Sequence, residues 1–243
     1  MSRWLLAAAA LVAAGLGAGG AYLGGLYRPL AAGPERSQIE RVVHDYLISH
    51  PEVLVEASTA LRRRESGKAI DADRAAITEP YGNAWSGNAR GDVVVVEYFD
   101  YNCGYCRASL PVIDQLIASD AKVRVVYRDW PILSAESATA ARYSLVAAEM
   151  GRFRDFHEAL YAAGPVSDAT IQQAVAQAGL DLAKVRAAVD TPRIDAELER
   201  NLNTAKKLGL SGSPSWVIGD QVVSSALPLE ELKRLVAEAR QAR

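Results

Sequence analysis

The segment that most restricts the fold of this chain is residues 93–99, which read Val-Val-Val-Val-Glu-Tyr-Phe. A nearly continuous run of β-branched and aromatic residues is typical of a strand covered on both faces. A helix is predicted from about Cys103, and residues 123–127 predict a second strand. A strand, a helix and a strand in this order indicate a parallel βαβ unit. The chain is therefore predicted to belong to the α/β class.

Beyond this unit the hydrophobic pattern is helical from residue 134 to residue 208. Short strands then fit at 215–218 and 221–223, and Pro228 opens a last helix that ends near residue 240. The pattern predicts a small sheet in two parts, residues 80–133 and 209–243, with the block 134–208 inserted between them. Helix boundaries within the block are expected at Gly151, Gly164-Pro165, Gly179 and Thr191-Pro192.

The composition excludes several classes of protein. Half of the residues are hydrophobic and 23% are charged, which is unlike a disordered chain. The formal net charge is −2, so nothing in the sequence indicates a nucleic-acid partner.

A helical arm is predicted ahead of the sheet, over residues 37–79. It follows a linker at 28–36 and starts at Ser37, which has Glu40 three residues on, as in a capping box. Pro51 separates two amphipathic helices, and the second reaches Gly67 with a helical extension over 68–77. The apolar stripe of this arm could pack on its own domain or on a second copy of the chain. Residues 80–91 are turn-rich, with room for one short edge strand.

Residues 1–27 are interpreted as a targeting segment rather than as part of the fold. The stretch from Trp4 to Tyr27 carries no charge and is long enough to cross a bilayer as a helix. Small residues at 18–21 suit a signal peptidase, whereas the apolar run to Leu26 suits an uncleaved membrane anchor. Both forms stay open, and in both the rest of the chain is expected in the periplasm or another extracytoplasmic space.

The chain has two cysteines, and both lie in the segment Cys103-Gly104-Tyr105-Cys106. No disulfide framework can therefore hold the fold together. The N-terminus of the predicted helix favours the thiolate of Cys103, and a deeper Cys106 could attack a mixed disulfide from inside. These two steps constitute thiol–disulfide exchange.

Other uses of the cysteine pair fit the sequence less well. Haem attachment needs a histidine after the second cysteine, where this chain has Arg107. A structural zinc site needs four ligands, and the chain has no second cysteine pair. Inert buried thiols are the remaining alternative. No cofactor and no metal are expected.

Glu97 is the lone carboxylate of its apolar strand and lies six residues before Cys103. Burial without a partner would raise its pKa, and such a group could relay a proton to or from Cys106. The alternative is a solvated Glu97 at a sheet edge.

Residues 97–106, together with Gly212-Ser213-Pro214 far downstream, resemble the DsbA-like branch of the thioredoxin superfamily. The resemblance covers about residues 80–243 and implies a thioredoxin fold with an inserted helical domain, preceded here by the N-terminal helical arm. Residues 37–65 also resemble the oligomerising arm of ScsC-type disulfide isomerases.

The resemblance implies a role for each matched residue. Cys103 aligns with the nucleophile and Cys106 with the resolving cysteine, so that the pair forms the redox disulfide Cys103–Cys106. Pro214 aligns with the cis-proline that faces this disulfide, and Ser213 with a position that tunes potential and substrate release. Glu97 matches a buried acid of the same strand. Pro111 matches a kink proline with a structural role.

One departure from the family bears on the direction of the reaction. The strongly oxidising member has a histidine between its cysteines, whereas this chain has Gly104-Tyr105, which leans toward an isomerase or reductase.

The resulting hypothesis is an oligomeric isomerase, assembled through residues 37–65, that acts on exported client proteins with cysteines and exchanges electrons with a membrane redox partner. A monomeric oxidase that donates its disulfide is the first alternative. A holdase or copper-binding module that uses the cysteines as ligands is the second.

Overall fold

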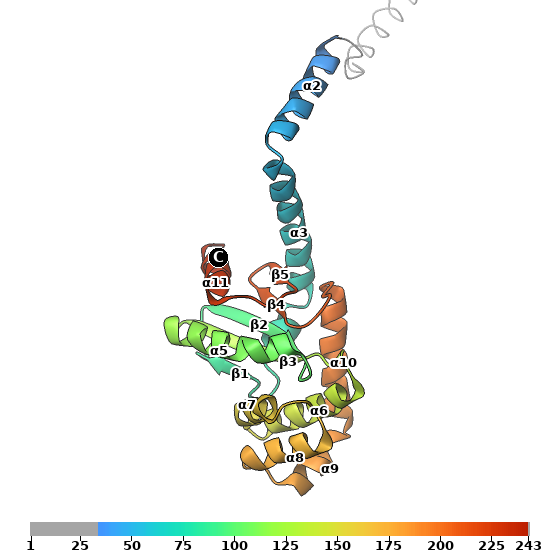
Figure 1. Ribbon diagram of the computed structural model, residues 1–243, viewed down its shortest axis with the longest axis vertical. Coiled ribbons are helices and arrows are strands. Elements are labelled where there is room, and N and C mark those ends of the chain that lie inside the picture. Colours follow the sequence, from blue (N-terminus) through green and yellow to red (C-terminus); the bar gives the residue numbers. More distant parts are fainter. Residues whose placement is uncertain (1–33, 243) are drawn as a thin grey trace, which may run out of the picture. The chain divides into compact units, whose positions relative to one another are not determined.

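The structure is a computed structural model that describes residues 34–242 (Figure 1). The chain divides into two compact units, one ending at Thr59 and one that runs from Ala60 to the C-terminus. The second unit contains a five-stranded mixed sheet. In spatial order its strands are β1 (Trp85–Gly87), β3 (Val123–Asp129), β2 (Val93–Phe99), β4 (Ser215–Ile218) and β5 (Gln221–Val223).

β2 is the central strand because its apolar residues are covered on both faces. Val95 and Phe99 belong to one buried cluster, whereas Val96 and Tyr98 belong to another. β2 pairs in parallel with β3 and antiparallel with β4. The predicted parallel βαβ unit is confirmed, and so are the two short C-terminal strands and the short edge strand β1.

β3 extends two residues beyond its predicted end, through Arg128 and Asp129. Charged residues usually mark the end of a buried strand, but here Arg128 is buried and paired with Glu197 at 2.7 Å. The guanidinium also donates to Asn201 and to the carbonyls of Ile77 and Glu79. A charge that is paired and fully hydrogen-bonded can continue a strand into the interior.

Helices cover both faces of the sheet (Figure 1). α5 (Gly104–Ser119) and α11 (Leu229–Gln241) pack together on one face, while α4 (Arg74–Thr78) and α10 (Pro192–Lys207) pack on the other. α5 follows β2 directly, so the end of the central strand and the start of this helix lie together. This junction carries the cysteine pair.

The helical block between β3 and β4 consists of five helices, as the sequence pattern predicts (Figure 1). Gly151 and Gly164 end two of them with φ of 75° and 98°, a conformation that favours glycine. The helices are α6 (Ala135–Glu149), α7 (Phe153–Ala163), α8 (Asp168–Gln177), α9 (Leu182–Val189) and α10. Side-chain caps at Ser134, Ser167 and Asp181 start α6, α8 and α9.

The arm consists of α2 (Pro34–Ser49) and α3 (Glu52–Ala72), followed by α4. The predicted helix start at Ser37 is wrong, because residues 34–36 are already helical and proline fits a first turn. The predicted linker 28–36 is therefore wrong over 34–36, and residues 28–33 lie outside the described residues. The helix also passes through Gly67, where an added Cβ would lie 3.3 Å from the Cβ of Asp220. Gly67 thus permits a close approach instead of ending the helix.

The predicted targeting segment, residues 1–27, lies outside the described part of the chain. Within residues 34–242, no helix has both the length and the apolar character needed to span a bilayer.

Candidate functional site

Cys103 is the N-cap of α5, the helix that follows the central strand. Its Sγ accepts a hydrogen bond from the backbone N–H of Cys106 at 3.3 Å, so an otherwise unpaired N–H of the first turn points at this sulfur. Both cysteines are free thiols and both are buried, with exposed fractions of 6% for Cys103 and 2% for Cys106. The sulfur of Cys103 therefore lies at the N-terminus of α5, where the first-turn N–H groups have no partner within the helix.

The loop before β4 lies against Cys103. The Ser213–Pro214 peptide bond is cis, and the Cys103 thiol donates to the carbonyl oxygen of Ser213 at 3.2 Å. Cys103 and Ser213 are 110 positions apart in sequence. The structure therefore brings Cys103, Ser213 and Pro214 together, as the family resemblance implies.

Glu97 is buried in the central strand, and the alternative of a solvated edge position is wrong. Its exposed fraction is 1%, and its neighbours in the sheet register are Tyr127 on β3 and Trp216 on β4. Its Oε1 has no hydrogen-bond partner. Burial, and to a smaller degree the charge of Cys103, raises the pKa of Glu97 to about 8. The carboxyl group thus titrates near neutral pH, where a proton relay operates best.

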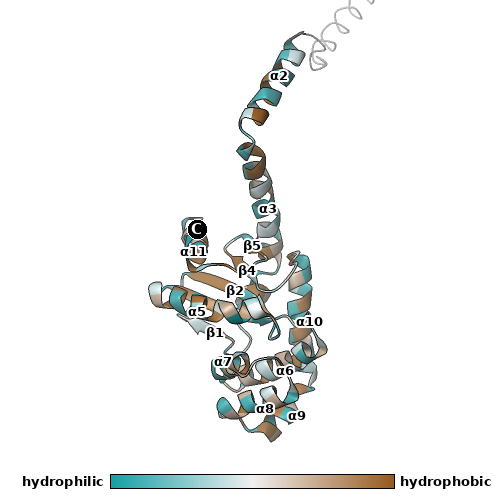
Figure 2. Cartoon of the chain, in the orientation of Figure 1, coloured by the Kyte–Doolittle hydropathy of each residue, from teal (hydrophilic) through white to brown (hydrophobic). Residues whose placement is uncertain are grey.

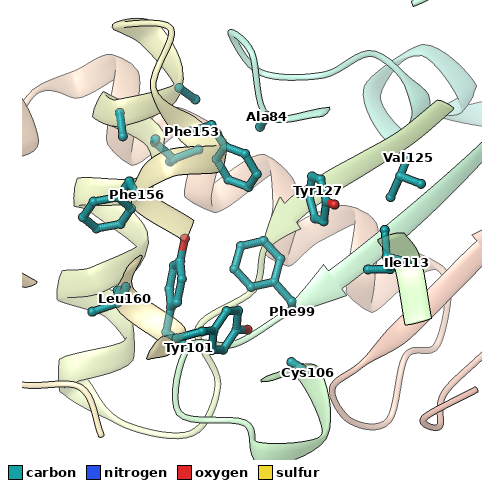
Figure 3. Close-up of a cluster of buried hydrophobic side chains, with 14 of the residues drawn as sticks. Ala84, Phe99, Tyr101, Cys106, Ile113, Val125, Tyr127, Phe153, Phe156 and Leu160 are labelled. Carbon is teal, nitrogen blue, oxygen red and sulfur yellow. The ribbon is translucent and has the colours of Figure 1, made fainter. Parts of the chain in front are cut away.

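Cys106 lies deeper than Cys103, in the buried cluster that contains Phe99 and Tyr101 (Figure 3). Burial raises the pKa of the Cys106 thiol, and both the charge of Glu97 and the hydrogen bond with Cys103 add to the rise. Only the backbone N–H of Asp100 acts against it. Cys106 therefore remains a thiol at neutral pH and needs a base before it can attack.

The residues between the cysteines face outward. Tyr105 is 70% exposed, and no atom lies within 4 Å of the position where a Cβ of Gly104 would be. Such a surface leaves room for a protein chain to approach the nearly covered Cys103 sulfur.

Sequence reasoning missed the polar residues that hold the cysteine turn. Asp100 and Asn102 are buried or half-buried and bond to the helical block, and Tyr161 of α7 donates to the Asp100 carbonyl at 3.0 Å. An aspartate that directly follows a buried strand, three residues before a cysteine, is a signal that could have found the first of them.

His157, on α7, is buried among aromatic side chains. Its Nδ1 lies 3.0 Å from the Tyr101 hydroxyl, and its ring packs against Phe99 and Phe153. Burial, and secondarily the charge of Arg154, lowers the pKa of His157 to about 3, so the imidazole is neutral. In the described part of the chain, no three side chains of the His, Cys, Asp or Glu types gather as metal ligands would.

A cysteine pair spaced Cys-x-x-Cys at the start of a helix, within a βαβ unit, defines a thioredoxin-like redox site. Residues 94–237 match the DSBA-like thioredoxin domain, and residues 35–66 match the N-terminal domain of the copper resistance protein ScsC. The chain belongs to the DsbA-like thioredoxin family of thiol–disulfide oxidoreductases and carries a ScsC-type N-terminal segment.

Solved structures agree with this assignment. A thioredoxin-like oxidoreductase from Silicibacter pomeroyi is 35% identical, with a TM-score of 0.67, and the match covers 70% of this chain and 99% of that one. A linker-deletion mutant of Proteus mirabilis ScsC is 25% identical, with a TM-score of 0.68 and coverage of 89% and 100%. The thiol-disulfide exchange protein α-DsbA2 from Wolbachia pipientis is 28% identical, with a TM-score of 0.67 and coverage of 73% and 97%.

The curated relatives that match are longer proteins. The Na⁺/H⁺ antiporters NhaA 3 from Salinispora tropica and NhaA 1 from Salinispora arenicola are 26% and 25% identical over 156 residues. The match covers 63% of this chain, which spans about a quarter (24%) of the length of each antiporter.

Proposed function

We propose that this protein is an exported disulfide isomerase and reductase that acts on other exported proteins. Its reactive group is the Cys103–Cys106 pair. The observation that carries the reaction is the position of Cys103, whose sulfur caps α5 and lies 3.2 Å from the carbonyl of Ser213. Cis-Pro214 and Ser213 form the wall opposite the sulfur, where a client backbone would lie.

The proposed reaction starts with attack of the Cys103 thiolate on a client disulfide. A bond forms between Cys103 and one client sulfur, and the other client sulfur leaves as a thiolate. In isomerisation, a client thiolate then attacks the mixed disulfide, forms the new client disulfide and releases Cys103 as the thiolate.

Reduction ends differently. The Cys106 proton passes to ionised Glu97, and the Cys106 sulfur attacks Cys103, which forms the Cys103–Cys106 disulfide and releases the second client sulfur as a thiolate. Glu97 returns its proton to this thiolate and water protonates the first one, so the client leaves as a dithiol. A membrane redox partner with a dithiol then supplies the two electrons and two protons that restore the reduced pair.

The arm supports assembly into an oligomer through residues 37–65. Ile39, Val42, Val43 and Tyr46 are each more than half exposed and follow helical spacing along α2, so they lie on one side of this helix. Figure 2 shows apolar residues interspersed with polar ones along α2. A contiguous apolar face on a charged helix is typical of a surface that another copy covers. The match to the ScsC N-terminal domain falls on the same residues. Several sites on one oligomer could then face a single misfolded client.

The dipeptide Gly104-Tyr105 bears on the redox potential, and the N-terminal leader bears on export. Neither residue between the cysteines supplies an imidazole to stabilise the reduced thiolate, which favours a less oxidising pair than in the strongest oxidants. The uncharged segment before Arg28 supports export, either with cleavage or as an anchor.

The test is reactivation of scrambled ribonuclease in a glutathione buffer by the chain without residues 1–27. We expect catalysed reactivation by the wild type and a return to the uncatalysed rate with Cys103→Ser, because the nucleophile is lost. Rapid oxidation of reduced ribonuclease without reactivation of the scrambled form would instead favour the monomeric oxidase.

A second prediction concerns the arm. Val43→Glu places a charge on the apolar face of α2, so we expect the molar mass in light scattering to fall to that of one chain. Reactivation of scrambled ribonuclease should fall with it, roughly tenfold, whereas reduction of a small disulfide by the variant should stay unchanged. Arg41→Glu, on the opposite side of the helix, is the matched control and should keep the wild-type mass. A wild type that is already monomeric would contradict the role of the arm.

The copper-binding alternative has one observation in its favour, the match of residues 35–66 to a domain of a copper resistance protein. Thiolates suit Cu(I). This reading would gain ground if Cys103→Ser removed catalysis but left copper or client binding intact.

A further inference from the structure

Asp100 is a buried aspartate at the end of β2, three residues before Cys103, and it connects the cysteine turn to three other segments. Its exposed fraction is 1%. Oδ1 accepts from the backbone N–H of Asn102 at 2.8 Å and from the Ser137 hydroxyl at 2.6 Å. Oδ2 accepts from the backbone N–H groups of Ile132 and Leu133 at 2.8 and 2.9 Å. Every one of these partners is a donor, which suits a carboxylate that accepts only.

The backbone of Asp100 contacts the cysteine turn directly. Its carbonyl accepts from the N–H of Cys103 and from the hydroxyl of Tyr161, both at 3.0 Å. One residue thus bonds to Cys103, to α6 through Ser137 and to α7 through Tyr161.

Asn102, the next polar residue of the turn, connects it to the same block. Its side chain donates to the Ser134 hydroxyl at 2.9 Å and accepts from the backbone N–H of Val166 at 3.1 Å. The helical block therefore holds the turn through both Asp100 and Asn102, and the Asp100 carboxylate alone accepts four hydrogen bonds.

We propose that Asp100 is a positioning residue for the dithiol reaction. Its carboxylate holds the turn in the geometry that aims the N–H of Cys106 at the Cys103 sulfur. This role rests on the proposed function, in which Cys103 is the nucleophile. This role also explains why the Asp100 carboxylate, which makes no hydrogen bond to a cysteine sulfur in this structure, is buried and accepts four hydrogen bonds.

The substitution Asp100→Asn tests this role, because it keeps the size of the side chain and removes acceptor capacity. An amide replaces one acceptor oxygen by an NH₂ group, and that group would face donors at either end of the carboxylate. The Ser137 hydroxyl can reverse its role, but the three backbone N–H groups cannot. The matched control is Asp129→Asn. Asp129 is equally buried, but its carboxyl accepts one bond, from Ser144 at 3.1 Å. Its other oxygen, Oδ1, has no hydrogen-bond partner, so an NH₂ group at that position would face no donor.

The experiment compares full-length wild type, Asp100→Asn and Asp129→Asn, each reduced. It measures the iodoacetamide reaction rate of Cys103 at pH 6, the equilibrium constant of the dithiol with glutathione, and thermal unfolding. For Asp100→Asn we expect the alkylation rate to fall roughly tenfold and the equilibrium to move toward the protein disulfide by a similar factor. Asp129→Asn should change either value by less than about twofold. Ser137→Ala removes a single donor and should move both values in the same direction as Asp100→Asn, by about two- to threefold.

Four outcomes would overturn the proposal. In the first, Asp100→Asn changes thermal unfolding alone. In the second, Asp100→Asn and Asp129→Asn shift the alkylation rate and the equilibrium constant alike. In both cases the role of Asp100 would be structural. A faster alkylation would mean that the charge of Asp100 opposes the thiolate and that positioning is secondary. If Asp100→Asn does not fold, wild-type values of the alkylation rate and the glutathione equilibrium constant in Ser137→Ala would likewise contradict the proposal. A wild type as unreactive as Cys103→Ser would contradict the proposed function itself, which separates the two failures.

Discussion

Cys106→Ser is expected to stop the reductive reaction at a covalent enzyme–client disulfide. The serine cannot attack the Cys103 sulfur, so release depends on an outside thiol, and client reduction should slow by roughly 10³-fold because an intramolecular step is lost. The mixed disulfide should accumulate with a client peptide whose cysteine carries a disulfide-bonded aromatic thiol, which leaves as a thiolate when Cys103 attacks. It would appear as a band of summed mass on a non-reducing gel and would disappear with dithiothreitol.

The pattern of single variants is the control for this result. Cys103→Ser should form no adduct, because Cys106 is 2% exposed and burial keeps it protonated. Isomerisation of scrambled ribonuclease should survive Cys106→Ser in part, since client thiols can themselves resolve the mixed disulfide. An adduct on Cys106 in the Cys103→Ser protein would reverse the assignment of the two cysteines.

Glu97→Gln is expected to change how stability depends on pH. The unfolded chain loses the Glu97 proton near pH 4.5, whereas the folded protein keeps it to about pH 8. Between these values ionisation stabilises the unfolded state alone, so the wild type loses stability as pH rises from 4.5 to 8. The difference corresponds to roughly 5 kcal/mol as an upper value. The glutamine variant lacks this loss, and its stability relative to wild type should rise by up to that amount between pH 4 and pH 8.5.

Urea unfolding of both proteins at pH 4, 6 and 8.5 measures this difference and cancels the constant cost of a buried amide. Glu199→Gln, at an exposed carboxylate of α10, should show no such trend. The variant should also lose the rise in the rate of Cys106 attack that the wild type shows from pH 6 to pH 8, because no base remains to take the thiol proton. A pH-independent stability difference would mean that Glu97 titrates normally in the folded protein.

The local features of this site were predictable because they depend on neighbours in sequence. Residues 93–99 are apolar enough to require a central strand, and that strand makes Glu97 a buried acid. The position of Cys103 at the start of a helix follows from the helical pattern after it. Gly151 and Gly164 end helices where expected, since few other residues adopt their backbone conformation.

The features that escaped prediction depend on contacts between distant segments. The cis bond before Pro214 came only with a family resemblance, because a sequence carries no local mark of it. The bonds of Asp100 to Ile132, Leu133 and Ser137 join residues more than 30 positions apart. One local feature also escaped prediction, because α2 begins at Pro34, ahead of the Ser37 and Glu40 pair that has the form of a capping box.

The separation of 110 positions between Cys103 and Ser213 has a consequence for how the protein is made. During synthesis the two thiols emerge long before the loop that covers them, and β4 joins the sheet beside β2 only after the whole helical block has been produced. A chain interrupted before Pro214 would carry both cysteines without the wall opposite them. In the incomplete polypeptide, Cys103 and Cys106 are therefore open to reaction with other thiols and disulfides. Only after the C-terminal segment is complete does the Pro214 loop lie against Cys103.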